Sequence, residues 1–424
     1  MLAAVGWTMG EAQERGPLTL TDVLPTDVPQ ARLCGAKRVG EFARNAVFAV
    51  VCSLLAIASA ELIFRALGYD FEQQEEARDA WPIFYRQPIE PVGDIFFRRS
   101  GPVIWQGRVI STALRLNGAS NSSYADEQEV TIKYDKLGFR NPEGLDDWDV
   151  VVVGDSFTEL GHLPYEELFT TQLGKLQDLR VKNLGVSHTG PLSYVFYLKE
   201  YGKSASTKEA LVVFFEGNDI PDLQDEEERL ARFRANGRRE YRTIRKQTSL
   251  VRALARGIHR ASRTITRDST DQERFEADAY FMTAAGSIPI TIGCRPIGQN
   301  DVTAAQAASL ESAFSQWAEA SRAVGMRPWL VYMPCKIRAL YPRLVRRAAG
   351  QIDWSPTDLP ELVERLAKRH GIYFIDVTLP LRKAAEEGEL SYNPIWDTHL
   401  NKSGSRIVAK AIADELSRLT GMPH

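Results

Sequence analysis

Four short polar clusters in this sequence contain the residue types that a protein needs to cleave an ester. A serine hydroxyl becomes a nucleophile when a neighbouring imidazole removes its proton, and an acid orients and stabilises that imidazole. Ser156 is therefore the predicted nucleophile, His399 the base and Asp397 the acid. The four clusters are Gly154-Asp155-Ser156-Phe157-Thr158, Asn183-Leu184-Gly185, Glu216-Gly217-Asn218-Asp219 and Asp397-Thr398-His399.

Two of these clusters contribute hydrogen-bond donors to the predicted site. Attack on an ester places negative charge on the carbonyl oxygen, and one donor aimed at that oxygen commonly lowers the barrier by about 3 kcal/mol. The predicted donors of this oxyanion hole are the backbone N–H groups of Ser156 and Gly185 and the side-chain amide of Asn218. The α/β-hydrolase elbow is excluded, because it requires a glycine where this chain has Thr158.

The clusters follow segments that read as strands of one sheet. From Trp148 onward, apolar runs of strand length alternate with helical patterns, which is typical of a parallel sheet covered on both faces. In such a sheet, ligands bind at the carboxyl ends of the strands. The expected strands are 149–153, 181–184, 210–215, 328–333 and 373–375, and the expected helices are 166–176, 192–201, 304–324, 358–369 and 404–419.

In this order, the blocks GDSFT, NLG, GND and DTHLN resemble the four signature blocks of SGNH (GDSL) hydrolases. The resemblance covers about residues 148–420. It implies a flavodoxin-like three-layer α/β/α domain with a doubly wound, five-stranded parallel sheet, and it implies hydrolysis or transfer of acyl esters without a cofactor. The four named places of the family fall on Ser156, Gly185, Asn218 and His399.

Three positions depart from the family pattern. The acid, Asp397, stands two residues before the histidine, whereas in most members of the family it stands three residues before it. The shorter spacing resembles that of SGNH-type polysaccharide O-acetyltransferases of the alginate kind. Glu216 occupies a place where glycine is usual, and Phe157 replaces a common leucine.

Three further residues are candidate substrate contacts because they stand in or beside the polar clusters. Asp155 precedes the serine, His188 follows Gly185 in the same loop, and Lys336 follows the fourth strand. A solvated loop lysine is the alternative interpretation of Lys336, and an incidental loop histidine is that of His188.

The N-terminal part contains one segment of membrane length. Residues 45–64 are nearly all apolar, and about 20 such residues span the hydrocarbon core as a helix. Basic residues precede the segment, so the N-terminus is predicted to be cytoplasmic and the remainder periplasmic or extracellular. A signal anchor over 41–66 and a signal peptide cleaved near Ala58-Ser59-Ala60 are both open.

The remaining segments are assigned by composition. Residues 1–40 read as a disordered tail, 67–147 as an irregular, β-containing extension packed on the main domain, and 148–424 as the catalytic domain. An arginine-rich insertion at about 221–300 is either a basic surface for anionic lipid or polysaccharide, or a pair of helices with solvated arginines.

Net charge and cysteine count exclude other classes. The net charge of -3 gives no reason to expect nucleic acid as a partner, and the four cysteines have no zinc-binding spacing, so no metal is expected. Cys294 and Cys335 either pair in an oxidising compartment or remain two buried thiols.

These observations predict serine-dependent hydrolysis of acyl, first of all acetyl, esters outside the cytoplasm. The predicted substrate is an acyl-ester small molecule or an acylated polysaccharide. An O-acyltransferase acting on a cell-envelope polysaccharide is the first alternative, and a non-catalytic envelope binding or assembly module is the second. The oligomeric state does not follow from the sequence.

Overall fold

The computed structural model describes residues 31–66, 89–108, 129–237, 277–345, 352, 354–394 and 398–420. The chain divides into two units, Met1–Gly68 and Tyr69–His424. The first unit contains α1 (Ala31–Ala66), in which Arg44–Ile63 is long and apolar enough to cross a membrane, with a mean hydropathy of 2.3. The sequence predicted this apolar helix, but α1 begins ten residues before the expected start at residue 41.

A five-stranded sheet forms the centre of the second unit. Its order is β6-β5-β7-β10-β12, and every neighbouring pair is parallel. Of the five strands of this sheet, β5 comes first in the chain, and it lies between β6 and β7, which come second and third. The strand order therefore reverses at β5, and the predicted doubly wound α/β fold is confirmed. The strands are β5 (Val150–Gly154), β6 (Val181–Gly185), β7 (Glu209–Phe215), β10 (Arg327–Met333) and β12 (Tyr373–Asp376).

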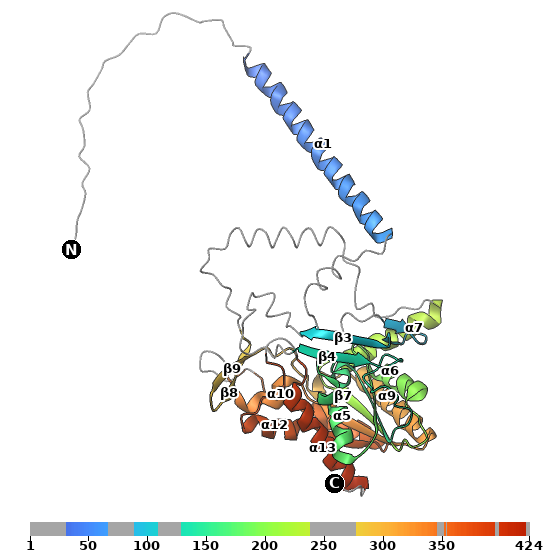
Figure 1. The fold of residues 1–424 in the computed structure, drawn as a ribbon. Helices are drawn as coiled ribbons and strands as arrows, with labels where there is room; N and C mark the ends of the chain where they lie inside the picture. The colour runs from blue at the N-terminus through green and yellow to red at the C-terminus, as the bar shows by residue number, and fades with distance from the viewer. Residues whose placement is uncertain are drawn as a thin grey trace, which may run out of the picture. The chain divides into compact units, whose positions relative to one another are not determined.

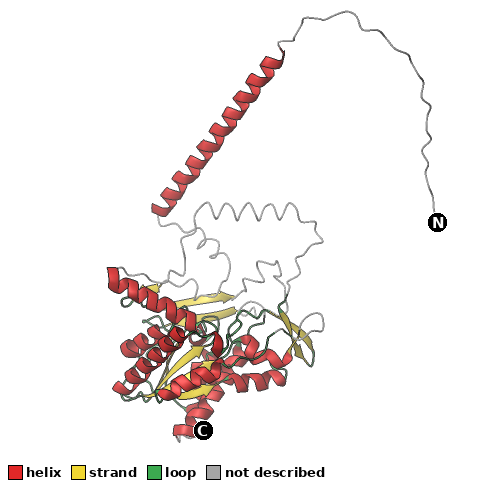
Figure 2. Cartoon of the chain, turned by 180° about the vertical axis from the view of Figure 1, so that it is seen from behind, coloured by secondary structure: helices red, strands yellow, loops and turns green. Residues whose placement is uncertain are grey.

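Helices cover both faces of this sheet (Figures 1 and 2). Val150 and Val152 of β5 pack into one core cluster with α5, α12 and α13, while Val151 and Val153 pack into the other with α6, α9 and α11. Because both faces are buried, the strand is an unbroken apolar run. The helices are α5 (Phe169–Gln177), α6 (Pro191–Tyr201), α9 (Ala304–Ala323), α11 (Leu359–Arg369), α12 (Thr378–Glu386) and α13 (Lys402–Thr420). Of these, α12 was not predicted.

The segment before the sheet forms two antiparallel pairs, β1 with β2 and β3 with β4. It contributes Phe97 and Phe139 to a core cluster of the sheet, and the hydroxyl of Tyr197 donates to the carbonyl of Phe97. The strands are β1 (Ile89–Pro91), β2 (Phe97–Arg99), β3 (Val103–Arg108) and β4 (Glu129–Tyr134).

The insertion between the third and fourth sheet strands begins with a long helix, α7 (Asp219–Asn236), and includes the hairpin β8 (Ala279–Thr283) and β9 (Gly286–Ile290). With β11 (Leu344–Val345), the hairpin forms a small antiparallel sheet. Short helices complete the second unit: α4 (Ser156–Glu159), η2 (Tyr165–Glu167), η3 (Gln299–Asp301), α10 (Lys336–Leu340) and η4 (Tyr341–Arg343).

The arginine-rich run was predicted to face outward, and its first member does not. Arg229 is buried on α7, where its guanidinium donates to Asp225 at 3.1 Å and to the carbonyl of Ile95 at 3.1 Å. It therefore attaches α7 to the extension and contributes nothing to a basic surface. The arginines of this run beyond residue 237 lie outside the described residues.

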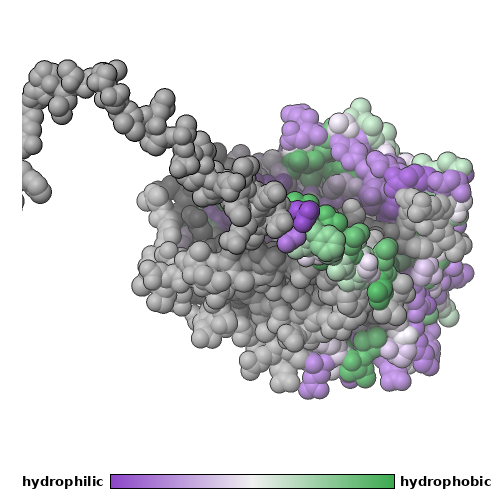
Figure 3. All heavy atoms as spheres, turned by 90° about the horizontal axis from the view of Figure 1, so that it is seen from above, coloured by the Kyte–Doolittle hydropathy of each residue, from purple (hydrophilic) through white to green (hydrophobic). Residues whose placement is uncertain are grey.

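Large exposed apolar side chains of the second unit are scattered. Ile104 on β3 and Leu379 on α12 are 72% and 67% exposed. On the face in Figure 3, hydrophobic residues form separate patches between hydrophilic ones. Scattered apolar residues of this kind are ordinary on a protein surface.

Candidate active site

Asp155 joins the end of β5 to the start of α4 and organises the turn that presents Ser156. Its Oδ1 accepts the N–H of Phe157 at 2.8 Å, and its carbonyl accepts those of Thr158 and Glu159 at 3.1 and 2.9 Å. The first N–H groups of a helix have no acceptor inside the helix, so Asp155 provides one for each of these three. The N–H of Ser156 precedes them at the start of α4, and the Ser156 hydroxyl donates to Oδ2 of Asp155 at 3.4 Å.

Burial dominates the electrostatics of Asp155. Its side chain is inaccessible to solvent, and this burial raises the pKa of the carboxyl to about 6, against the opposing effects of the Phe157 N–H and of His399. The neighbouring charge of Asp222 raises the pKa further, and the Asn218 amide lowers it. The carboxyl of Asp155 thus lies within electrostatic reach of both His399 and Asn218.

Two glycines at the ends of adjacent strands make room for α4. Gly154 of β5 is paired in register with Gly185 of β6. A Cβ at Gly154 would lie 2.2 Å from Oγ1 of Thr158, and one at Gly185 would lie 2.3 Å from the backbone nitrogen of Glu159. No side chain fits at either position, which explains why glycine follows both apolar runs.

The N–H of Gly185, which the sequence predicts as an oxyanion donor, has an acceptor inside the fold. Its N–H donates to Oδ1 of Asn183 at 2.8 Å, so the side chain two residues earlier already uses this donor. The glycine acts through its lack of a side chain, because that permits the close approach of α4.

Asn218 follows β7 and lies beside the end of β5. Its Nδ2 donates to Oδ2 of Asp222 at 2.9 Å, and its amide acts on the pKa of Asp155. The next residue, Asp219, is buried; it accepts the Phe215 N–H at 3.0 Å and the Tyr194 hydroxyl at 2.8 Å. Burial, reinforced by the charge of Asp155, raises the pKa of Asp219 well above its usual range.

His399 comes from the last loop before α13, and its imidazole packs against the residue next to the predicted nucleophile. Its ring centroid lies 4.7 Å from that of Phe157, which in turn stacks on Phe215 at 3.9 Å. The loop is closed by a hydrogen bond from the Asn393 N–H to the His399 carbonyl at 3.0 Å. His399 is only 5% exposed. Asp397, the predicted acid, lies outside the described residues.

A second histidine near His399 was not identified from the sequence. The ring of His162 lies 5.9 Å from that of His399, and its Nε2 is 2.9 Å from the carbonyl of Leu400. His162 is buried and also contacts Asn393, with 3.3 Å between Nε2 and Nδ2. It supports the loop that carries His399. The sequence offers no signal for it beyond its position shortly after Ser156.

A buried charge network behind α4 was also missed. Glu159 accepts hydrogen bonds from Arg99 of β2, at 3.1 and 3.4 Å, and from the hydroxyl of Tyr134 of β4, at 2.6 Å. Both the N–H and the hydroxyl of Ser187 donate to the same carboxylate. Arg99 and Glu159 are fully buried, and the positive charge of Arg99 helps to lower the pKa of Glu159 against the effect of burial. The extension therefore directly contacts α4, the helix that begins at Ser156.

His188 adopts a left-handed backbone conformation with φ of +65°. Such conformations are uncommon for residues other than glycine and occur disproportionately at functional sites. The residues on both sides are held: Ser187 by Glu159, and Thr189 by a hydrogen bond from its hydroxyl to the carbonyl of Val186 at 2.6 Å.

Lys336 is not a solvated lysine. None of its described contacts is with Ser156. It is fully buried at the start of α10, and its Nζ donates to the carbonyls of Thr291 at 2.8 Å and Pro394 at 3.5 Å. Its ammonium group is used inside the fold. Among the described residues, no group of three or more histidine, cysteine or acidic side chains is placed to hold a metal ion.

Comparison with known proteins gives low-level structural likeness only. No family model and no curated protein matches the chain. It is similar to LAE5, an alpha/beta hydrolase from the metagenome of Lake Arreo, at 14% identity over 68% of this chain and all of that one, with a TM-score of 0.32.

Two other solved structures are similar at the same level. One is a carbohydrate esterase family 2 enzyme of Corynascus thermopiles (Myceliophthora fergusii), at 10% identity over 66% of this chain and 68% of that one, with a TM-score of 0.32. The other is Axe2, an acetylxylan esterase from Geobacillus stearothermophilus, at 12% identity over 64% and 94%, with a TM-score of 0.30. Likeness at this level says nothing about substrate or residue roles.

Proposed function

We propose that this chain is a serine esterase of the SGNH type that cleaves acyl esters outside the cytoplasm. The observation that carries the proposal is the packing of the His399 ring on Phe157, the neighbour of Ser156. Asp155 and Asn218 lie at the same carboxyl edge, where the strand order reverses. These residues come from three separate segments, 155–157, 218 and 399, and the arrangement has the components of acyl transfer through a serine.

The proposed reaction assigns a role to each of these residues. Ser156 Oγ attacks the carbonyl carbon of the ester while the imidazole of His399 accepts the hydroxyl proton. The C–O bond to the alcohol then breaks, and His399 returns the proton to the departing alcohol, which leaves an acyl-serine. Water attacks this acyl group and gives a proton to His399, and Ser156 leaves with that proton. Asp397 is the acid that we assign to orient His399.

Two donors are assigned to the oxyanion. The N–H of Ser156 stands at the start of α4, and the side-chain amide of Asn218, which donates to Asp222 and interacts with Asp155 beside Ser156, is the second donor that we assign. We do not assign the Gly185 N–H as a donor to the oxyanion, because it already donates to the side chain of Asn183. Donors already positioned in a buried site stabilise the transition state without further reorganisation.

A location outside the cytoplasm is supported by two independent features. The apolar stretch Arg44–Ile63 is long enough for a membrane anchor, and Cys294 is bonded to Cys335. Disulfides persist in oxidising compartments and are rare in the cytosol. Protease digestion of intact and of lysed spheroplasts tests this location: a catalytic domain outside the cytoplasm is degraded in both, whereas protection in intact spheroplasts contradicts it.

The activity is tested with the full chain in detergent. A fluorophosphonate probe and a small acetyl ester are offered to the wild type, to Ser156→Ala and to Ser315→Ala, whose serine lies on the exposed face of α9. We expect labelling and turnover in the wild type and in Ser315→Ala, and neither in Ser156→Ala. If all three proteins remain unlabelled and inactive, the chain is not an esterase and the binding-module alternative takes its place.

Transfer and hydrolysis share the acyl-serine and differ in the nucleophile that reaches it. The Asp-x-His spacing at Asp397 and His399 favours a polysaccharide hydroxyl as the second candidate acceptor. Adding an oligosaccharide acceptor to the esterase assay separates the two reactions. An acetylated oligosaccharide detected by mass spectrometry identifies a transferase, and free acetate alone identifies a hydrolase.

A further inference from the structure

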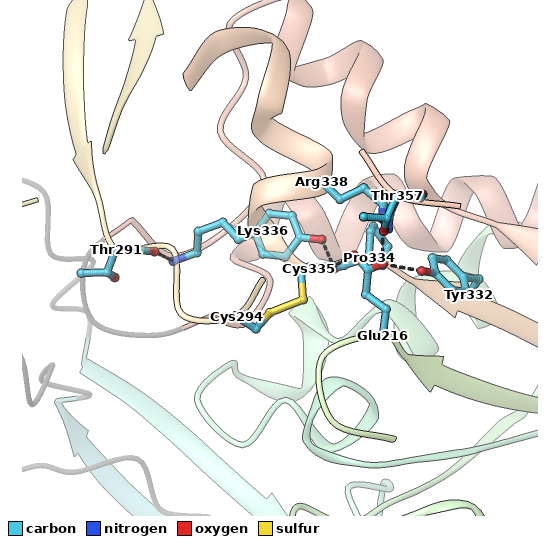
Figure 4. Close-up of a disulfide and its surroundings, with 10 residues drawn as sticks. Glu216, Thr291, Cys294, Tyr332, Pro334, Cys335, Lys336, Arg338 and Thr357 are labelled. Carbon is cyan, nitrogen blue, oxygen red and sulfur yellow. Dashed lines mark hydrogen bonds and ion pairs between the residues drawn. A yellow bond between two sulfur atoms is a disulfide. The ribbon is translucent and has the colours of Figure 1, made fainter. Parts of the chain in front are cut away.

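The Cys294–Cys335 disulfide joins the segment after β9 to the start of α10 (Figure 4). Cys335 follows β10 and is fully buried, whereas Cys294 is half-buried in the segment after β9. A Cβ at Gly217, the neighbour of Asn218, would lie 3.1 Å from the sulfur of Cys294. The disulfide is therefore adjacent to the loop that presents Asn218.

The segment that contains Cys294 also lies against the loop of His399. A Cβ at Gly293 would lie 3.1 Å from both Cβ and Oγ1 of Thr398, the residue before His399. The N–H of Thr291 donates to the carbonyl of Pro394 at 2.8 Å. The described part of this histidine loop, residues 391–394 and 398–401, is thus bordered by residues 291–294.

Lys336 joins the same two segments from the other side of the disulfide. Its Nζ donates to the carbonyls of Thr291 and Pro394, and Figure 4 shows its side chain extending toward Thr291. Its neighbour Cys335 is held in turn, because its N–H donates to Oε1 of Glu216 at 2.6 Å. Arg338 pairs with the same carboxylate at 2.7 Å. Cys335 and Arg338, which follow β10, are therefore both bound to Glu216 at the end of β7.

We propose that Cys294, Cys335 and Lys336 form a clamp that positions His399 for catalysis, so that the activity depends on the oxidised disulfide. The inference rests on the proposed esterase function. The clamp residues do not touch the reacting atoms; they hold residues 291–294 against the histidine loop. A thiol reductant removes the covalent part: two reductant thiols become a disulfide, and Cys294 and Cys335 each take up one proton and one electron.

The test uses the full chain in detergent and four proteins: wild type, Cys294→Ala, Lys336→Met and the control Cys52→Ala. Cys52 is a free, exposed cysteine in α1. The measurements are kcat and KM for the acetyl ester, thermal unfolding, and hydrogen exchange of peptides that contain Asn393 and Asn401. Each protein is assayed before reduction, after reduction with dithiothreitol and after re-oxidation.

We expect kcat of Cys294→Ala and of the reduced wild type to fall at least tenfold while KM stays within about twofold, because small displacements of a catalytic group reduce rates steeply. Lys336→Met loses kcat in the same way. Amide exchange in the histidine loop accelerates, and re-oxidation restores the wild type but not Cys294→Ala. Cys52→Ala behaves as the wild type throughout.

Two results would overturn the clamp. One is a folded, disulfide-free protein whose kcat remains within twofold of the oxidised wild type. The other is unchanged hydrogen exchange in the histidine loop after reduction, which decides the structural claim even if the wild type has no esterase activity. An oxidised wild type without turnover rejects the esterase function itself and, with it, the catalytic role of the clamp.

Discussion

The imidazole of His399 and the phenyl ring of Phe157 lie 4.7 Å apart, although their residues belong to the last loop and the first strand-helix turn of the domain. Phe157 is held in place by Phe215, on which it stacks at 3.9 Å. The ring next to Ser156 thus forms the surface on which the predicted base rests. This contact places the ring of His399 beside the start of α4.

Replacing His399 with alanine removes the group that we assign as acceptor of the serine proton. We expect kcat for an acetyl ester to fall roughly 10²–10⁴-fold, the usual contribution of general acid-base catalysis. His370→Ala is the matched control, because His370 lies next to Glu311 on the surface. Steady-state kinetics with both variants checks the assignment, and equal activity of His399→Ala and His370→Ala would exclude His399 as the base.

Replacing Asn218 with alanine removes one of the two donors that we propose for the oxyanion. A single donor of this kind contributes about 10²–10³ in kcat, so we expect a loss of that size with little change in KM. Asn236→Ala, at the other end of α7, serves as control. A variant that loses affinity for the ester but keeps its kcat would show that Asn218 binds the substrate and does not stabilise the transition state.

Substitutions of the two adjacent arginines on β2 are expected to lower the stability by very different amounts. Arg99 forms a fully buried pair with Glu159, whereas Arg98 pairs with Glu90, whose side chain is 42% exposed. Arg99→Met leaves a buried carboxylate without its counter-charge, and we expect it to lower the free energy of unfolding by about 3–5 kcal/mol. Arg98→Met should cost no more than about 1 kcal/mol. Urea unfolding measures both, and similar losses would contradict a special role for the buried pair.

The raised pKa of Asp155 predicts how the stability depends on pH. Above about pH 6 the carboxyl is charged in both states, and the folded protein carries the cost of burying that charge. Between pH 6 and the ordinary value of 3.8, the folded state binds a proton that the unfolded state does not. This one group therefore adds stability as the pH falls through 6, by up to about 3 kcal/mol, and the contribution is lost as the pH rises.

Asp155→Asn lacks this contribution because an amide does not titrate. Urea unfolding of the wild type and the variant at pH 4.5 and pH 7 gives the difference directly, with Asp414→Asn on the surface of α13 as control. We expect the advantage of the wild type over Asp155→Asn to be larger at pH 4.5. The same pH dependence in both proteins would show that the carboxyl of Asp155 titrates normally.

Local sequence patterns were sufficient to predict the five strands of the main sheet and their succession along the chain. Strands buried on both faces must be continuous apolar runs, and the four valines of β5 show this directly. Helix α12 was missed because it follows β12 after a single residue, so the apolar pattern shows no clear boundary there. Helix α7 was not named as a separate helix and was included in the insertion, because its highly charged sequence has only a weak apolar pattern.

The sequence by itself determined the succession of strands and helices along the chain, the apolar helix and the identities of the polar residues at the strand ends, because each depends on residues close together in the chain. Only the tertiary structure decided which of those groups are available: the Gly185 N–H is used by Asn183, Lys336 is buried, and Arg99 reaches Glu159. It also decided that Cys294 pairs with Cys335. Such contacts join distant segments and are set by how the layers pack, so no local spacing of residue types encodes them.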